Sequence, residues 1–171
     1  MTVYDKKLKE LSIILQQDNI FKVKAAIRSL RESPSFEGAI GLLVSLYDRS
    51  PDQSLKKIIA DFMNDLKGNS VCSEVVAEMN KNRKPETITM LVSSCWQSGL
   101  DYSGYCKDFA GIFLSADYFT AIECFTVLEA SVESLNRSQK NEVIEIIKKG
   151  RLSPGDEKYP LVNELLRRLF R

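Results

Sequence analysis

The chain has 171 residues, with 24 lysine and arginine residues against 23 aspartate and glutamate residues, so its formal net charge is +1. A hydrophobic fraction of 44% and a charged fraction of 27% are ordinary for a globular protein, and the length suits a single domain with a sizeable core. The chain contains no histidine, which excludes Ser-His-Asp and Cys-His catalysis and most metal sites.

Apolar residues recur with helical spacing along nearly the whole chain, and no convincing strand interrupts them. This pattern predicts helices over about 2–17, from an N-cap at Asp18 to a stop at Ser33 and Pro34, over 36–47, from Ser50-Pro51 to Gly68, over 71–79, and from Pro85 to Gly99. It continues with helices from a cap at Asp101 to Ser103 through Phe113, over about 117–131, over 138–150, and from Pro160 onward. The helix over 117–131 is apolar on most of its surface, so we expect it to be covered on two sides.

The predicted helices form five pairs, and the pairing repeats. The second helix of each pair begins near residues 19, 52, 86, 117 and 160, so the first three intervals are 33, 34 and 31 residues and the last is 43. A near-constant interval of two short helices is typical of stacked helical hairpins. The longer last interval leaves a divergent C-terminal cap over 132–171 as an alternative to a strict repeat.

The second helices carry a resemblance to a known class of repeat proteins. Their shared pattern is a capping residue or proline followed by an apolar stripe: Pro51-Asp52 with Leu55, Ile58, Ile59 and Phe62; Pro85-Glu86 with Ile88, Leu91, Val92 and Cys95; and Asp117 with Ile122 and Phe125. Across essentially the whole chain this pattern resembles HEAT and armadillo-type α-solenoids, and residues 85–131 resemble small uncharacterised bacterial proteins of HEAT-like type. The resemblance implies a right-handed α-α superhelix of about five hairpins that binds another macromolecule along one face, without catalysis.

The cysteines and the hydropathy pattern bear on compartment and cofactors. Cys72, Cys95, Cys106 and Cys124 form no Cys-x-x-Cys pair, so we expect buried hydrophobic residues in a reducing compartment rather than a metal site. No signal peptide is visible, and no apolar run approaches the roughly 20 residues of a membrane span. We therefore expect a cytoplasmic protein without membrane contact, metal or cofactor.

Two motifs match catalytic patterns only weakly. Ser54 and Lys57 fit Ser-x-x-Lys, in which a lysine one turn away activates a serine, but the Ser-Asp-Asn and Lys-Thr-Gly motifs that accompany it are absent. Asp61 and Asp65 stand one turn apart, as half a metal site would, but lie opposite the apolar stripe and are expected to face solvent. We therefore expect no enzyme and no small-molecule substrate.

The segment from Trp96 to Ser103 combines aromatic and polar residues that could form a binding surface. With Ile88 as the centre of the buried face, Trp96 falls about 80° away and Gln97 about 180° away, so the only tryptophan lies at the flank of the core. Packing of Trp96 between hairpins and capping by Asp101 is the favoured interpretation of this segment. A binding ridge is the alternative, because exposed Trp and Tyr side chains are favoured interface anchors. We expect a non-catalytic scaffold or adaptor whose candidate protein-binding residues are Thr89, Ser93, Trp96, Gln97, Asp101, Tyr102, Glu123 and Glu129.

Nucleic-acid binding is the alternative. Residues 85–136 carry a net charge of −6, but the flanking segments 1–84 and 137–171 carry +3 and +4. Positive groups aligned on one face suffice for phosphate contacts. The candidate residues lie in two basic loops: Lys81, Arg83 and Lys84, and Lys148, Lys149 and Arg151.

Overall fold

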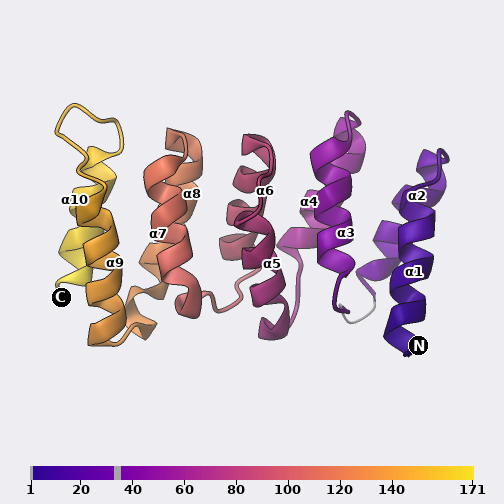
Figure 1. Cartoon of the computed structure of the whole chain (residues 1–171), viewed down its shortest axis with the longest axis horizontal. Helices are drawn as coiled ribbons and strands as arrows, with labels where there is room; N and C mark the ends of the chain where they lie inside the picture. The colour runs from indigo at the N-terminus through magenta and orange to yellow at the C-terminus, as the bar shows by residue number, and fades with distance from the viewer. Residues whose placement is uncertain (1, 33–35) are drawn as a thin grey trace. The chain divides into compact units, whose positions relative to one another are not determined.

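The computed structural model describes residues 2–32 and 36–171, and every regular element in this part of the chain is helical (Figure 1). The ten α-helices are α1 (Val3–Leu15), α2 (Ile20–Leu30), α3 (Ala39–Arg49), α4 (Gln53–Asn64), α5 (Cys72–Met79), α6 (Pro85–Gln97), α7 (Cys106–Ser115), α8 (Tyr118–Ser131), α9 (Arg137–Lys149) and α10 (Tyr159–Leu169). Short 3₁₀ segments cover Asn69–Val71, Ser103–Tyr105 and Val132–Ser134. The all-α prediction is confirmed, whereas the predicted stop at Ser33 and Pro34 lies outside the described residues.

The contacts between helices divide the chain into two compact units, Met1–Leu100 and Asp101–Arg171. In the first unit each helix contacts its hairpin partner, so α1 contacts α2, α3 contacts α4, and α5 contacts α6. The odd helices α1, α3 and α5 also pack in sequence, as do the even helices α2, α4 and α6. The first unit is thus two rows of helices with a core between them, in which Ile40, Leu43, Ile59 and Leu91 are fully buried.

In the second unit α7 packs on both α8 and α9, and α10 packs on α8 and α9. Helix α8 is therefore covered by α7 on one side and α10 on another, as its continuous apolar surface predicts. The aromatic core side chains Phe109 and Phe113 are fully buried here. All four cysteines of the chain are buried, which confirms their prediction as core residues.

Several helix starts differ from the prediction by one or two residues. The N-cap of α2 is Asn19, which accepts a hydrogen bond from the Lys22 N–H, and not Asp18. The N-cap of α4 is Asp52, while the Ser50 hydroxyl accepts from the Asp52 N–H. Polar capping residues that follow one another in the sequence compete for the same role, so propensity alone does not choose between them.

Three helix ends are capped by side chains from other elements. Glu74 of α5 accepts hydrogen bonds from the Gly38 and Gly41 N–H groups at the start of α3, at 3.3 and 3.0 Å. Asp48 of α3 accepts from the Lys84 N–H and the Thr87 hydroxyl at the start of α6, at 2.9 and 2.7 Å. In the second unit, the Lys158 ammonium caps the end of α7. These contacts satisfy backbone groups that a helix terminus leaves without partners.

No helix in the described part of the chain is both long and apolar enough to cross a membrane.

Candidate functional site

Helix α6 is held at both ends, which fixes the direction of its outward face. Pro85 occupies its first turn, and Asp48 from α3 supplies the cap that the N-cap residue Lys84 does not provide. At the other end Gly99 adopts φ +67, and its N–H donates to the Trp96 carbonyl at 3.3 Å. The helix end predicted at Gly99 is confirmed, and this residue adopts the left-handed conformation that favours glycine.

The buried face of α6 is rotated from the predicted one. Ile88, taken as the centre of the stripe, is half-buried, whereas the polar Thr87 and Ser94 side chains are 0% and 1% exposed. Thr87 donates to Asp48, and the Ser94 hydroxyl donates to the Leu91 carbonyl at 2.7 Å. Because the true core face is centred closer to Leu91, Trp96 points further outward than the sequence predicts, and 44% of its surface is exposed.

We use the name α6 ridge for Thr89, Ser93, Trp96 and Gln97, which lie on the outward side of this helix. The Gln97 amide donates to the Ser93 hydroxyl at 2.7 Å, and the Thr89 hydroxyl donates to the Pro85 carbonyl at 3.0 Å. Between Thr87 and Gln97 the helix carries no charged residue. The α6 ridge therefore presents an indole beside neutral hydrogen-bonding groups.

The remaining protein-binding candidates belong to the second unit and take other roles. Tyr102 is 2% exposed, with its ring edge-on to Phe109 at 5.9 Å between centroids, so the expectation of an exposed anchor is corrected. Asp101 accepts from the Ser103 N–H at 2.9 Å, and hydrogen bonds from the Ser103 side chain and backbone lower its pKa. Asp101 thus acts as a local cap before α7.

The two acidic candidates on α8 differ from each other. Glu129 pairs with Arg168 of α10 at 2.6 Å, so its charge is used within the second unit. Glu123 is half-buried. Of these two protein-binding candidates, Glu129 is thus engaged within its own unit and Glu123 is only partly accessible.

The first basic loop is largely neutralised by a residue that the sequence analysis missed. Glu78 of α5 is 2% exposed and pairs with both Lys81 and Arg83, and Arg83 also donates to the Ser45 hydroxyl at 3.0 Å. Of this loop, only Lys84 is an exposed cation outside the Glu78 cluster. The sequence contained a signal for this role, because Glu78 lies on the apolar face that includes Val75 and Met79. An acidic residue in such a position is expected to be buried with a cationic partner.

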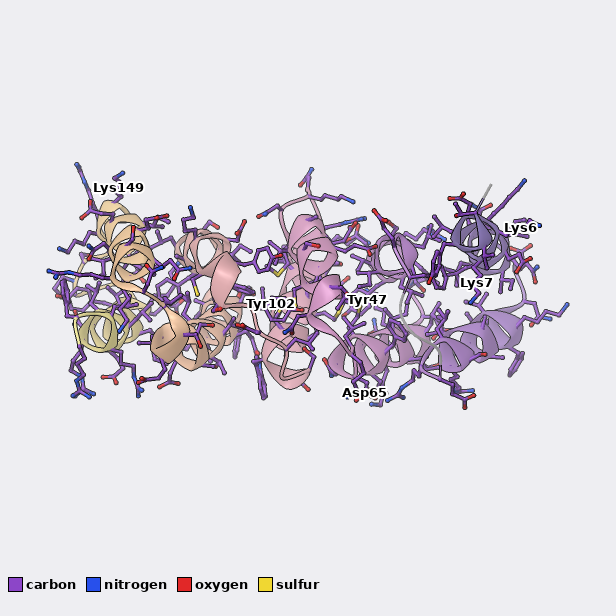
Figure 2. All side chains as sticks on the ribbon, turned by 90° about the horizontal axis from the view of Figure 1, so that it is seen from below. Lys6, Lys7, Tyr47, Asp65, Tyr102 and Lys149 are labelled. Carbon is purple, nitrogen blue, oxygen red and sulfur yellow. The ribbon has the colours of Figure 1, made fainter. Side chains whose placement is uncertain are left out.

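The second basic group lies at the end of α9. Lys148, Lys149 and Arg151 are all exposed, and Figure 2 shows Lys149 projecting outward from its helix. The Lys148 ammonium lies over the Phe170 ring, 5.3 Å from its centroid. Among the described residues these three form no ion pair, unlike Lys81 and Arg83, which pair with Glu78.

The residues of the two weak catalytic motifs form hydrogen bonds and ion pairs with separate partners. Ser54 accepts a short hydrogen bond from Lys24 of α2, whereas Lys57 pairs with Asp61 at 3.3 Å. Asp65 pairs with Arg31. Serine and lysine of the motif therefore have different partners, and the two aspartates each face a cation.

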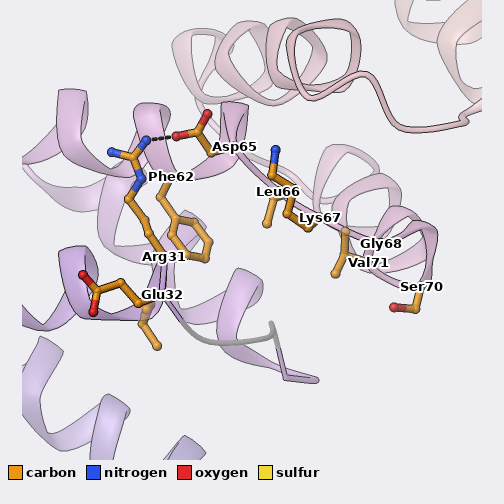
Figure 3. Close-up of a pocket in the computed structure, with 10 residues that line it drawn as sticks. Arg31, Glu32, Phe62, Asp65, Leu66, Lys67, Gly68, Ser70 and Val71 are labelled. Atoms are coloured by element: carbon orange, nitrogen blue, oxygen red, sulfur yellow. Dashed lines mark ion pairs between the residues drawn. The ribbon is translucent and has the colours of Figure 1, made fainter.

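A hollow of about 490 Å³ lies where α2 and α4 end in the first unit (Figure 3). Its lining combines the apolar Leu30, Phe62, Leu66 and Val71 with the Arg31–Asp65 ion pair. The opposite charges at its edge neutralise each other, so the hollow selects neither an anion nor a cation.

The described residues thus form an all-α protein with an exposed indole on α6. No match to this chain was found among family models, curated proteins or solved structures.

Proposed function

We propose that this protein is a non-catalytic scaffold that binds a protein partner through the α6 ridge. The observation that supports this proposal is the position of Trp96: the only tryptophan is 44% exposed on a helix face without charged residues. Tryptophan is enriched among the residues that dominate binding energy, and charged residues are depleted at interface cores.

We further propose that the helices form a HEAT-like, right-handed solenoid. The two rows in the first unit support this, and so does a repeated ion pair between even helices. Lys24 of α2 pairs with Asp52 before α4 at 3.4 Å, and Lys56 of α4 pairs with Glu86 in the first turn of α6 at 2.6 Å. A contact that recurs between successive hairpins is expected of a repeat array, because each repeat meets its neighbour in the same way.

The chemistry of the α6 ridge defines the kind of partner. An indole edge flanked by hydroxyl and amide groups suits an apolar or aromatic side chain whose neighbouring backbone groups hydrogen-bond to Thr89, Ser93 or Gln97. A highly charged partner surface fits poorly, because no ion pair is offered along this face.

Affinity capture with matched baits tests this function. The wild-type chain is compared with Trp96→Ala and with Tyr4→Ala, which removes another exposed aromatic (63% exposed) on the odd helix α1. We expect a partner that Trp96→Ala loses and Tyr4→Ala retains, with the purified pair weakened by at least about 2 kcal/mol, the scale of a binding hot spot. Equal recovery by all three baits would contradict a binding role for the α6 ridge.

Nucleic-acid binding is supported by fewer of the candidate cations than the sequence suggests. Since Lys81 and Arg83 pair with Glu78, it rests on Lys84 in the first unit and on Lys148, Lys149 and Arg151 in the second. Retention on heparin that falls steeply with salt, and that is lost when the α9 cations are neutralised, would favour it over the scaffold function.

A further inference from the structure

A second hollow, of about 500 Å³, lies in the second unit between α9 and the end of α10. We call it the α9–α10 hollow. The residues that line it are Leu135, Arg137, Lys140, Asn141, Ile144, Leu169, Phe170 and Arg171. None of them was a candidate site residue in the sequence analysis, and the hollow belongs to a different compact unit from the α6 ridge.

The lining is positive, and none of its side chains is acidic. Arg137, Lys140 and Arg171 contribute three cations, and none of them has an ion-pair partner among residues 2–32 and 36–171. Uncompensated positive charge around one concave surface attracts anionic groups.

The acids of the surrounding helices are already paired elsewhere or exposed outside the lining. Glu142 of α9 pairs with Lys107 at 2.8 Å, and Glu164 of α10 pairs with Arg167 and Arg168. Glu145 and Glu133 are exposed and do not line the hollow. No acidic side chain of α9 or α10 therefore lies in the lining beside these cations.

The floor of the hollow is apolar. Leu135, Ile144 and Leu169 are buried, while Phe170 is 65% exposed beside them. An exposed phenylalanine next to buried aliphatic side chains offers apolar contact area to a ligand, in addition to charge.

We propose that the α9–α10 hollow binds a short acidic peptide segment that carries one large apolar side chain. The apolar side chain packs on Phe170 and Leu169, and flanking carboxylates pair with Arg137, Lys140 and Arg171. Guanidinium groups suit this role because they hold a carboxylate through two parallel hydrogen bonds.

The same features disfavour a nucleic-acid strand. Single-stranded nucleic acid is held by successive aromatic platforms along a basic groove. Here one aromatic residue lines the hollow, and one face of its ring already carries the Lys148 ammonium at 5.3 Å. A single apolar side chain between carboxylates matches the hollow more closely than a run of stacked bases.

The test uses the full chain and fluorescence anisotropy of a labelled peptide in which acidic residues flank a single phenylalanine. Arg137→Gln, Lys140→Gln and Arg171→Gln are each expected to weaken binding about 5–10-fold, in line with the loss of one charge-assisted contact. Phe170→Ala is expected to weaken it at least about 10-fold. Arg167→Gln is the matched control: it removes a guanidinium from α10 that pairs with Glu164 and does not line the hollow, and we expect less than about a twofold change.

Two further probes complete the test. A peptide with alanine in place of the phenylalanine is expected to bind at least about 10-fold more weakly, since it keeps the charges and loses the apolar anchor. A labelled single-stranded oligothymidylate is expected to bind more weakly than the acidic peptide. Absence of peptide binding, an equal loss in Arg167→Gln, or tighter binding of the oligothymidylate would each overturn the proposal. Circular dichroism of every variant establishes that the folded protein is being compared.

Discussion

Lys158 shows how one side chain completes a helix that lies more than forty residues away in the sequence. It is 8% exposed, and its ammonium donates to the carbonyls of Phe113, Leu114 and Ala116 at 3.3, 2.7 and 3.0 Å. A cation at this end also interacts favourably with the α7 dipole. The burial of the charge is therefore compensated by these three hydrogen bonds.

Replacing this lysine should destabilise the protein strongly. We expect Lys158→Met to lower the free energy of unfolding by about 2–4 kcal/mol, because it leaves buried carbonyls without donors while keeping a similar side-chain volume. Urea denaturation followed by circular dichroism measures the change. Lys107→Met is the control, since the Lys107–Glu142 pair is exposed on both sides, and it should change stability by no more than about 1 kcal/mol.

The stability of Trp96→Ala measures how far the indole packs on the core. Emptying an aromatic core site costs about 3–5 kcal/mol, whereas surface changes stay within about 0.5 kcal/mol. With 44% of the indole exposed, we expect an intermediate loss of about 1.5–3 kcal/mol by urea denaturation. Gln97→Ala should stay within about 0.5 kcal/mol. If Gln97→Ala unfolds the chain instead, the outward direction of the α6 ridge is wrong.

Asp48 gives the start of α6 a dependence on pH. Burial alone would raise its pKa, but hydrogen bonds from Thr87 and the Lys84 N–H, with the charges of Arg83 and Lys84, hold the pKa below its usual range. A lowered folded-state pKa stabilises the protein above the unfolded pKa, and this contribution disappears as the pH falls through the folded value. The stability difference between wild type and Asp48→Asn should therefore be constant above about pH 5 and shrink below about pH 4. A difference that instead grows in acid would refute this role.

At the scale of the elements, the even helices are joined by lysine–acid pairs of unequal strength. Lys56 is 7% exposed at its side chain and also lies 5.0 Å from the centroid of the Tyr47 ring, whereas Lys24 and Asp52 are 18% and 37% exposed. Glu86 is itself 50% exposed, so the advantage of the Lys56–Glu86 pair lies in its buried lysine and in its distance of 2.6 Å against 3.4 Å. The series of lysine–acid pairs between even helices ends at α6, which contains no lysine. The first compact unit also ends there.

Double-mutant cycles can rank these pairs. We expect a coupling energy of about 1 kcal/mol for Lys56→Met with Glu86→Gln, because Lys56 is buried while Glu86 is half exposed. The cycle of Lys24→Met with Asp52→Asn should give no more than about 0.5 kcal/mol. Equal couplings would show that burial of Lys56 does not strengthen its pair.

Helical spacing was sufficient to predict the helices, but not which face of α6 is buried or which distant side chains cap the helix ends. The apolar stripes give the all-α fold and the covered helix α8, because burial of a continuous face dominates local preference. The phase of α6 was misjudged because Thr87 and Ser94 are polar and yet buried, with their hydroxyls satisfied by Asp48 and by the Leu91 carbonyl. The tertiary caps escaped prediction since Glu74 and Gly41 are 33 residues apart and Asp48 and Thr87 are 39 apart.

At the scale of the whole molecule, the contacts fall into two compact units that meet in the sequence between Leu100 and Asp101. Local opening of a protein follows such cooperative groups of contacts. Lys158→Met should therefore raise amide hydrogen exchange in residues 101–171 more than in residues 1–100, as measured by mass spectrometry at peptide resolution. Equal acceleration in both units would show that the chain opens as one cooperative body.

The glycine at the start of α3 has a consequence for the order of folding. Gly38 has no side chain to cap its own helix, so the α3 terminus is completed only when Glu74 of α5 arrives, and the α6 terminus only when Asp48 of α3 does. In a nascent chain, therefore, neither the α3–α4 hairpin nor the α5–α6 hairpin can form all the hydrogen bonds at its helix ends by itself. A ribosome-bound fragment that ends after α4 would carry a frayed α3, which becomes firm once α5 has emerged and docked.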